Sequence, residues 1–292
     1  MDLHLRHVTR YHYSQPVMFG PHKLMIRPRD SFDLRILETE LDIFPAAALA
    51  WSHDVYGNPV ALATFADAAD RLEITSSLVL RRYGSALFRK PGPATAAFVP
   101  HYSDGERIVL QPFITPASAD ADGALAAWLA GVLQDPVGGD SLSRLAEAIH
   151  AGFGYSVRYE EGTQAPSQTL ALGAGSCRDL AWLFIEAVRR LGYAARFVTG
   201  YLHNATGEAG SNRAAVGLTH AWAEVFVPGD GWVEFDPTNA LVADPHLIRV
   251  AVARVPTDAS PVSGSFTGPF GAQIGLWVGV EITPIQGFAA VA

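Results

Sequence analysis

The sequence predicts an α+β protein in which a strand-rich N-terminal part precedes a part that combines helices with an antiparallel sheet. Three observations carry this prediction. The chain has 292 residues, too many for one ordinary hydrophobic core. Short runs within its first 83 residues alternate apolar and polar side chains with period two. Helical patterns begin only at residue 121 and are followed by further strands.

The N-terminal part is predicted to be an antiparallel β-sandwich over residues 1–90. Glycine- and proline-containing turns separate its strands, as at Phe19-Gly20-Pro21 and Tyr56-Gly57-Asn58-Pro59. The strand patterns themselves occupy residues 5–13, 22–29 and 71–83. Residues 84–100 contain several prolines and glycines without a clean period, which is typical of a linker.

The second part, residues 91–292, is predicted to pack helices on an antiparallel sheet and to include the C-terminal strands. Amphipathic or apolar helical patterns cover residues 121–134, 140–152 and 177–191. Strand patterns follow at residues 195–202, 220–227, 232–236 and 274–284.

Composition excludes several classes of protein. Hydrophobic residues make up 49% and charged residues 17% of the chain, which indicates a folded protein. The net charge of −8 and the lack of a Lys/Arg cluster disfavour binding to nucleic acid. No stretch approaches 18 consecutive apolar residues, and the N-terminal residues lack the apolar region of a signal peptide. A cytoplasmic protein with no membrane partner is therefore expected.

The only cysteine, Cys177, lies in the segment GAGSCRDLAW. Ser176 and Asp179 fit a capping box, which places Cys177 in the first turn of a helix. The positive end of the helix dipole favours a thiolate there, and a thiolate is the nucleophilic form. A lone buried cysteine also commonly fills a hydrophobic core, so this position alone leaves both roles open. One cysteine forms no internal disulfide and no multi-cysteine metal site.

A nucleophilic cysteine needs a base and a residue that orients the base. His220 begins a predicted hairpin whose second strand ends at Asp236. An even four-residue loop would place these two side chains on opposite faces of the sheet. A five-residue loop, residues 227–231, or a bulge would pair Phe226 with Trp232 and make His220 and Asp236 diagonal neighbours. A catalytic pair therefore requires the odd register.

The odd register also sets Glu224 opposite Glu234, which is unfavourable unless a cation lies nearby. Arg196, on the preceding predicted strand, is one candidate for this cation. The alternative is that both glutamates point into solvent.

These motifs together resemble the core of the transglutaminase-like superfamily. The resemblance rests on Gly-x-Gly-x-Cys177-x-Asp at a helix start, Arg196-x-Val-x-Gly-Tyr201, His220-Ala-Trp222-x-Glu224, and Gly231-Trp232-x-x-x-Asp236-Pro-Thr. The N-terminal part is similar to that of bacterial transglutaminase-like proteins described as cysteine proteases, through Tyr11-x-Tyr13-Ser-x-Pro-Val and Asp54-x-Tyr56-Gly57-Asn58. Relatives often carry a Gly-Arg-Asp-Tyr-like segment where this chain has residues 253–258, so substrate contacts made by that segment are in doubt.

The resemblance implies a papain-like fold in which Cys177 is the nucleophile, His220 is the general base and later the acid, and Asp236 orients the imidazole. It implies acyl transfer through a thioester on peptide or glutamine-type amide bonds, resolved by water or by an amine. The backbone N–H of Cys177 suits an oxyanion. Candidates for the second oxyanion or substrate contact are Tyr155, Tyr159, Gln164 and Trp222.

Three alternatives stay open at this point. A CoA-dependent acyltransferase would use the same three residue types, although no basic stripe suits the phosphates of CoA. A metal site could be built from Cys177, His220 and Asp236, although no ligand pair occurs on one helix. The fold could also serve as a catalytically idle binding module. If the chain is instead the acyl-transfer enzyme that the resemblance implies, its expected partner is a peptide or protein substrate, and no cofactor or metal is expected.

Overall fold

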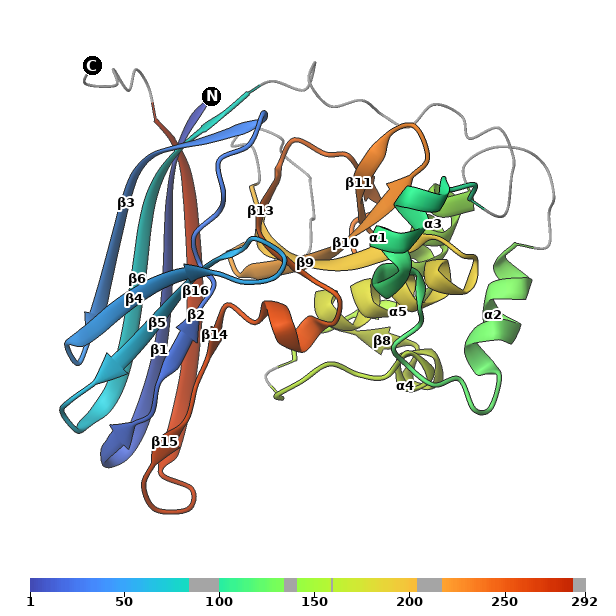
Figure 1. The fold of residues 1–292 in the computed structure, drawn as a ribbon. Helices are drawn as coiled ribbons and strands as arrows, with labels where there is room; N and C mark the ends of the chain where they lie inside the picture. The colour runs from blue at the N-terminus through green and yellow to red at the C-terminus, as the bar shows by residue number, and fades with distance from the viewer. Residues whose placement is uncertain (84–99, 134–140, 159, 204–216, 286–292) are drawn as a thin grey trace.

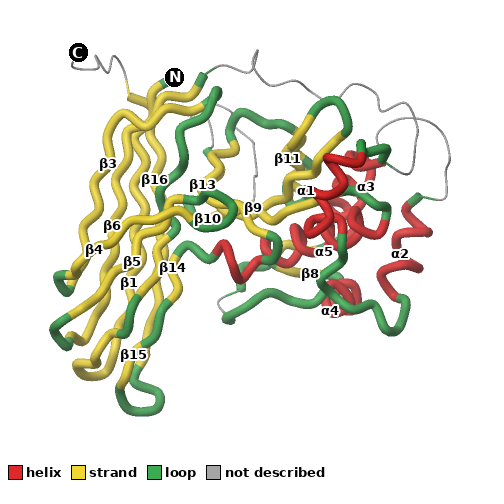
Figure 2. The backbone as a smooth tube through the Cα atoms, viewed as in Figure 1, coloured by secondary structure: helices red, strands yellow, loops and turns green. Residues whose placement is uncertain are grey.

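The computed structural model describes residues 1–83, 100–133, 141–158, 160–203 and 217–285. Strands dominate the N-terminal part, and helices cover one side of a second sheet, so the α+β prediction is confirmed. Figure 1 shows the N-terminal sheets at the left, the helices at the right, and the strands β9–β13 between them. Figure 2 marks the α-helices in red on the side away from the N-terminal sheets, and the red segment nearer those sheets is the 3₁₀ helix Pro256–Ala259.

The N-terminal part contains two antiparallel sheets whose facing apolar side chains form a core. This core contains Val17 and Phe19 of the first strand together with Ala61, Leu72 and Ile74, and Val17 and Phe19 lie two residues apart with the more exposed Met18 between them. The first sheet has the strands β1 (Asp2–Phe19), β3 (Leu34–Phe44), β6 (Ala69–Arg82), β15 (Phe266–Thr267) and β16 (Gln273–Ile285). The second has β2 (His22–Leu24), β4 (Ala47–His53), β5 (Pro59–Phe65) and β14 (Val262–Ser263).

The C-terminal strand β16 lies in the first of these sheets, beside β1 (Figure 1). The pairing is antiparallel and runs from Asp2 opposite Ile285 to Tyr13 opposite Gln273. The division expected from the sequence assigned this strand to residues 91–292 and the catalytic part. The physical reason for the difference is the edge of β1, which has β6 on one side and needs a partner on the other.

The second part packs helices against an antiparallel sheet with the strand order β12-β11-β10-β9-β13. Its strands are β9 (Ala194–Leu202), β10 (Thr219–Val227), β11 (Gly231–Asp236), β12 (Leu241–Val242) and β13 (Leu247–Ala253). Its helical elements are α1 (Asp104–Ile114), α2 (Ala124–Val132), α3 (Ser141–Gly152), α4 (Pro166–Leu172), α5 (Cys177–Arg190) and the 3₁₀ helix η2 (Pro256–Ala259). The short strands β7 (Gly154–Tyr155) and β8 (Ala174–Gly175) pair in parallel just before α5.

Helix α5 is the centre of the second core. Leu180, Leu183, Phe184 and Val188 are each at most 1% exposed. Phe184 stacks on Phe235 of β11, with ring centroids 5.6 Å apart. The helix is therefore fixed against the sheet by burial on most of its circumference, which holds its first residue in a defined place.

The two parts are joined by polar contacts as well as by packing. The amide of Asn58 donates to the carbonyl of Val252 at 2.7 Å, and its oxygen accepts from the N–H of Val252 at 2.9 Å. Asp54 orients Asn58 by accepting from its Nδ2 at 2.8 Å. The motif Asp54-x-Tyr56-Gly57-Asn58 therefore attaches the N-terminal part to β13.

Gly200 permits a close approach of strands next to the candidate site. It lies opposite His220 in the register of β9 and β10. A Cβ atom at this position would overlap the carbonyl of Ile248 and lie 2.6 Å from Cη2 of Trp222. Only a residue without a side chain therefore fits.

Replacing Gly200 by alanine is expected to lower the free energy of unfolding by about 1–3 kcal/mol, because backbone and a buried indole must both shift. Urea denaturation measures the change. The matched control is Gly105→Ala in α1, where a Cβ would meet nothing within 4 Å. That control should be neutral or stabilising by up to about 1 kcal/mol. Equal effects at the two positions would contradict the packing argument.

Candidate active site

The segment that precedes α5 places Cys177 at the first position of the helix. Ser176 is the N-cap, and it forms the predicted capping box with Asp179. The N–H and the hydroxyl of Ser176 both donate to Oδ2 of Asp179 at 2.8 Å. Cys177 is 7% exposed, so its thiol lies just beneath the surface. The backbone N–H groups of the first turn surround this position.

Asp179 also holds the loop that leads to the cysteine. Its carboxylate accepts from the N–H of Gln164 at 2.7 Å and from Nε of Arg158 at 2.8 Å. Burial alone would raise the pKa of Asp179, but the hydrogen bonds from Gln164, Ser176 and Arg158 outweigh burial and lower it. One buried carboxylate therefore connects residues 158–164 with the start of α5.

Replacing Asp179 by asparagine should destabilise the fold by about 2–4 kcal/mol, because the amide loses the charge that Arg158 and the N–H donors stabilise. Thermal or urea unfolding tests this expectation. Asp104→Asn in the first turn of α1 is the control, since that carboxylate is exposed, and it should cost less than about 1 kcal/mol. A loss at Asp179 as small as that of the control would show that the loop does not depend on this carboxylate.

The hairpin β10–β11 has the odd register that a His–Asp pair requires. Phe226 lies opposite Trp232 and Val227 lies opposite Gly231, so residues 228–230 form the loop. Gly229 and Gly231 adopt φ values of +86° and +82°, which glycine tolerates and which allow so short a connection. The predicted register is confirmed, but the loop has three residues and not the five expected, because Val227 and Gly231 also pair.

The odd register brings His220 and Asp236 together. Nε2 of His220 and Oδ2 of Asp236 are 2.8 Å apart, and both side chains are buried. Burial disfavours the protonated imidazole, but the Asp236 carboxylate, with a contribution from Cys177, outweighs burial and raises the pKa of His220 to about 10. The pKa of Asp236 is lowered, because the contacts with His220, Asn239 and Thr238 exceed the opposing effect of burial.

The second nitrogen of the imidazole, Nδ1, is not engaged by Asp236. Nδ1 of His220 is buried and has no hydrogen bond of ordinary geometry among the described residues. The thiol of Cys177 nevertheless contributes to the raised pKa of the ring, so the sulfur lies within electrostatic reach. Nε2 therefore bonds the carboxylate of Asp236, and Nδ1 is the nitrogen that can interact with Cys177.

Two side chains that the sequence did not single out complete the environment of Asp236. Nδ2 of Asn239 donates to Oδ2 of Asp236 at 2.8 Å, and the N–H of Thr238 donates to Oδ1 at 2.9 Å. The ring of His150 in α3 bonds the carbonyl of Thr238 at 2.8 Å through Nδ1. The sequence signal for Asn239 is its place in the turn directly after the strand that ends at Asp236.

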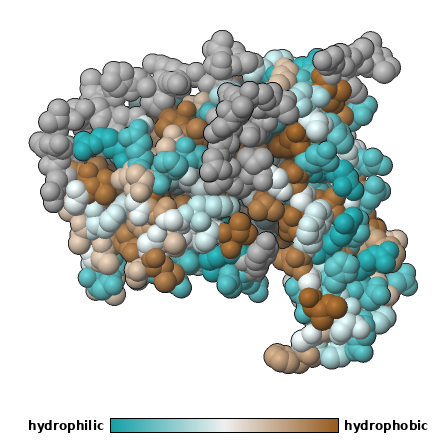
Figure 3. Space-filling model, turned by 180° about the vertical axis from the view of Figure 1, so that it is seen from behind, coloured by the Kyte–Doolittle hydropathy of each residue, from teal (hydrophilic) through white to brown (hydrophobic). Residues whose placement is uncertain are grey.

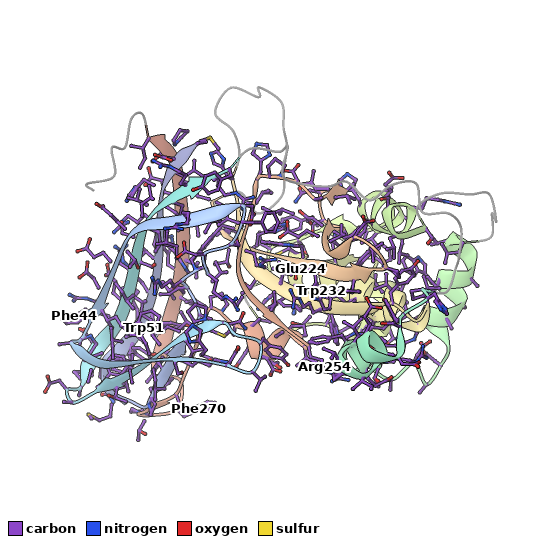
Figure 4. All side chains as sticks on the ribbon, turned by 45° about the horizontal axis from the view of Figure 1, so that its top comes forward. Phe44, Trp51, Glu224, Trp232, Arg254 and Phe270 are labelled. Atoms are coloured by element: carbon purple, nitrogen blue, oxygen red, sulfur yellow. The ribbon has the colours of Figure 1, made fainter. Side chains whose placement is uncertain are left out.

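Glu224 and Glu234 face one another across the hairpin, as the odd register predicts. Glu224 is fully buried and accepts from Nε of Arg196 at 2.6 Å and from Nη1 of Arg249. The Arg196 interpretation is confirmed, and the alternative in which Glu224 points into solvent is wrong. Arg249 is a second partner that the sequence did not reveal. Figure 4 labels Glu224 and Trp232 on this sheet.

Glu234 has a different environment from Glu224. Oε1 of Glu234 accepts from Nε1 of Trp222 at 3.3 Å. Burial, reinforced by the charge of Glu224, raises the pKa of Glu234 to about 8. Trp222 is fully buried, and its ring centroid lies 5.8 Å from that of His220. A neutral carboxyl thus supports the indole that lies beside the imidazole of His220.

The remaining candidate residues lie in the segment before the cysteine. Tyr155 pairs with Gly175 through β7 and β8, two residues from Cys177. Gln164 is buried, and its Oε1 accepts from Oγ1 of Thr169 at 3.0 Å, which turns its amide nitrogen away from Thr169. Tyr159 lies outside the described residues. The oxyanion roles of these residues stay predictions.

Among the described residues, no group of three or more His, Cys, Asp or Glu side chains is placed to hold one metal ion. No helix in the described ranges has the length and apolar character that crossing a membrane requires. On the face seen in Figure 3, apolar residues occur in small groups between polar ones.

Comparison with known proteins gives matches in both parts of the chain. Residues 3–81 match the bacterial transglutaminase-like N-terminal region, and residues 124–237 match the transglutaminase-like superfamily. An uncharacterized protein of Mycobacterium tuberculosis is 28% identical over 97% of this chain and 93% of its own length. A second, from Mycobacterium leprae, is 36% identical over 37% of each chain.

A solved structure shares the fold over almost the whole chain. It is that of a candidate cysteine protease from Cytophaga hutchinsonii, which is 18% identical and has a TM-score of 0.69. The similarity covers 98% of this chain and 92% of that protein. At this identity the similarity shows the fold alone.

Proposed function

Since residues 3–81 match the bacterial transglutaminase-like N-terminal region and residues 124–237 match the transglutaminase-like superfamily, we propose that this chain is a member of that superfamily and an enzyme of cysteine-dependent acyl transfer. The observation that carries the proposal is the buried pair of His220 and Asp236, 2.8 Å apart, within electrostatic reach of Cys177 at the start of α5. A nucleophile, a base and a residue that orients the base are thereby present together.

In the first step, the sulfur of Cys177, as a thiolate, attacks the carbonyl carbon of an amide. Because the pKa of His220 is about 10, the imidazole carries a proton at neutral pH. His220 donates this proton to the nitrogen of the departing amine as the C–N bond breaks. The product of this step is a thioester on Cys177 and a neutral imidazole.

In the second step, water or an amine attacks the thioester carbonyl. His220 accepts the proton of the attacking group, the C–S bond breaks, and the acid or the new amide leaves. Asp236 stabilises the imidazolium and keeps Nε2 engaged, so that Nδ1 performs both proton transfers. Water as acceptor gives a protease or amidase, and an amine gives a transglutaminase.

The negative oxygen that forms in each step needs hydrogen-bond donors. The backbone N–H of Cys177 at the helix start is one. For the second donor we favour Gln164, since Thr169 engages its oxygen and Asp179 fixes its backbone, which leaves the side-chain N–H₂ as the donor. Tyr155 and Trp222 are alternatives.

Mass spectrometry of the intact protein after incubation with a library of capped peptides tests the proposal. We expect a mass increase that maps to Cys177 and is removed by hydroxylamine, as a thioester should be. Adding a primary amine separates amine transfer from hydrolysis through the released product. The same experiment with acetyl-CoA tests a CoA-dependent acyltransferase. The absence of any adduct on a folded protein, across peptides and acetyl-CoA, would favour an idle binding module.

A further inference from the structure

A cavity of about 210 Å³ lies between the N-terminal part and the sheet of the second part. Trp232 and Glu234 of β11 line it, and they lie on the same face of that strand as Asp236. Cys177 and His220 are not among its lining residues. The charged and aromatic side chains of its wall are Arg29, Phe32, Asp33, Arg82, Asp230, Trp232, Glu234 and Arg249.

The ion pairs around this cavity leave a surplus of positive charge. Nη1 of Arg82 and Oδ2 of Asp33 are 2.6 Å apart and largely buried, so these two charges offset one another. Behind the wall, Glu224 is shared by Arg196 and Arg249. Burial and the charge of Glu224 raise the pKa of Glu234 to about 8, so Glu234 is neutral at lower pH. With Glu234 neutral, the ionised groups in and behind the wall are four guanidinium groups, those of Arg29, Arg82, Arg196 and Arg249, and three carboxylates, those of Asp33, Glu224 and Asp230.

The polar groups that face the cavity are mainly hydrogen-bond donors. Arg249 uses Nη1 to hold Glu224, and its planar guanidinium carries further N–H groups. A protonated carboxyl at Glu234 supplies an O–H donor while its Oε1 accepts from Trp222. Phe32 and Trp232 add aromatic surface. Such donors in a partly apolar space suit one negatively charged planar group.

We propose that this cavity binds a carboxylate, held by the guanidinium of Arg249 and the carboxyl of Glu234 and attracted by Arg29. Its volume equals about seven water molecules, which fits a small organic acid or the end of a peptide chain.

Isothermal titration calorimetry with the full-length Cys177→Ala protein tests the proposal independently of the proposed reaction. The probes are propionate and acetyl-Ala-Ala with a free carboxylate, and their controls are propionamide and the same dipeptide as its amide. At pH 6.5 we expect the carboxylates to bind at least about tenfold more tightly than the amides. Preference for propionate indicates a free acid as the ligand, and preference for the dipeptide indicates a chain end. No binding, or equal binding of acids and amides, overturns the proposal.

Two variants test the assigned contacts. Arg29→Ala removes an exposed guanidinium and should weaken carboxylate binding about tenfold, whereas Arg35→Ala, an exposed arginine away from the cavity, should not. Glu234→Gln stays neutral at every pH. The wild type should lose affinity for the carboxylate as pH rises through 8, because an ionised Glu234 repels the ligand and no longer donates a hydrogen bond. The charged groups that act on Glu234 are Glu224 of β10 and Asp33, which raise its pKa, and Arg82 of β6 and Arg249 of β13, which lower it. An identical loss in Glu234→Gln, or no effect of Arg29→Ala, would contradict the assignment.

Discussion

Replacing His220 by alanine is expected to slow acylation of Cys177 by about 10²–10⁴-fold. The variant loses both the proton that the departing amine needs and the positive charge beside the sulfur. His220 is 1% exposed and Asp236 is fully buried, so bulk water has little access to replace the lost imidazole. Single-turnover mass spectrometry of the thioester measures the rate.

The design of this experiment must separate chemistry from folding. His220→Gln keeps a side chain of similar length that donates to Asp236, and it should be as inactive as the alanine variant while folding more stably. His4→Ala is the matched control, because His4 lies on β1 and bonds Oγ of Ser77 at 2.9 Å. A His220 variant that acylates at the rate of this control would remove His220 from the mechanism.

Replacing Asp236 by asparagine is expected to lower the acylation rate by about 10²–10⁴-fold as well. The amide can hold the ring in place but does not stabilise an imidazolium, so the pKa of His220 should fall. In the wild type this pKa is raised from its ordinary value of 6.5 to about 10. Activity that depends on protonated His220 should therefore decline at a lower pH in the variant than in the wild type.

The same substitution should change how stability depends on pH. A folded-state pKa above the unfolded value means that the stabilisation is fully present below pH 6.5 and is lost as pH rises towards 10. Urea unfolding between pH 6 and pH 10 should show a smaller decline for Asp236→Asn. Asp244→Asn is the control, since Asp244 forms a partly exposed pair with His246 at 2.7 Å. Indistinguishable pH profiles for the wild type and Asp236→Asn would contradict the proposed coupling.

The parts of the site that are local in sequence could be predicted. Ser176 and Asp179 stand three residues apart, and this spacing alone predicts a capping box and a helix that begins at Cys177. The register of β10 and β11 is also local, because one short loop determines it. Without a bulge, contact between His220 and Asp236 is possible only if the loop between β10 and β11 has an odd number of residues, so a catalytic pair predicts that register.

The parts that depend on distant segments could not be predicted. Strand β16 pairs with β1 across nearly the full length of the chain, and its alternating pattern does not specify a partner. Arg249 reaches Glu224 only because β13 lies beside β9. The bond from His150 to the carbonyl of Thr238 joins a helix to a turn 88 residues away. Periodicity reports which face of a strand is buried, not which strand lies beside it.

The most direct test of the central claim is the rate at which iodoacetamide alkylates Cys177 in the folded protein at pH 6. The account predicts a rate at least about tenfold above that of the same cysteine in urea-unfolded protein, because the imidazolium of His220 and the start of α5 both favour the reactive form. Since Cys177 is the only cysteine, total labelling reports this site alone. A folded protein whose cysteine reacts no faster than that of the unfolded chain would contradict the account.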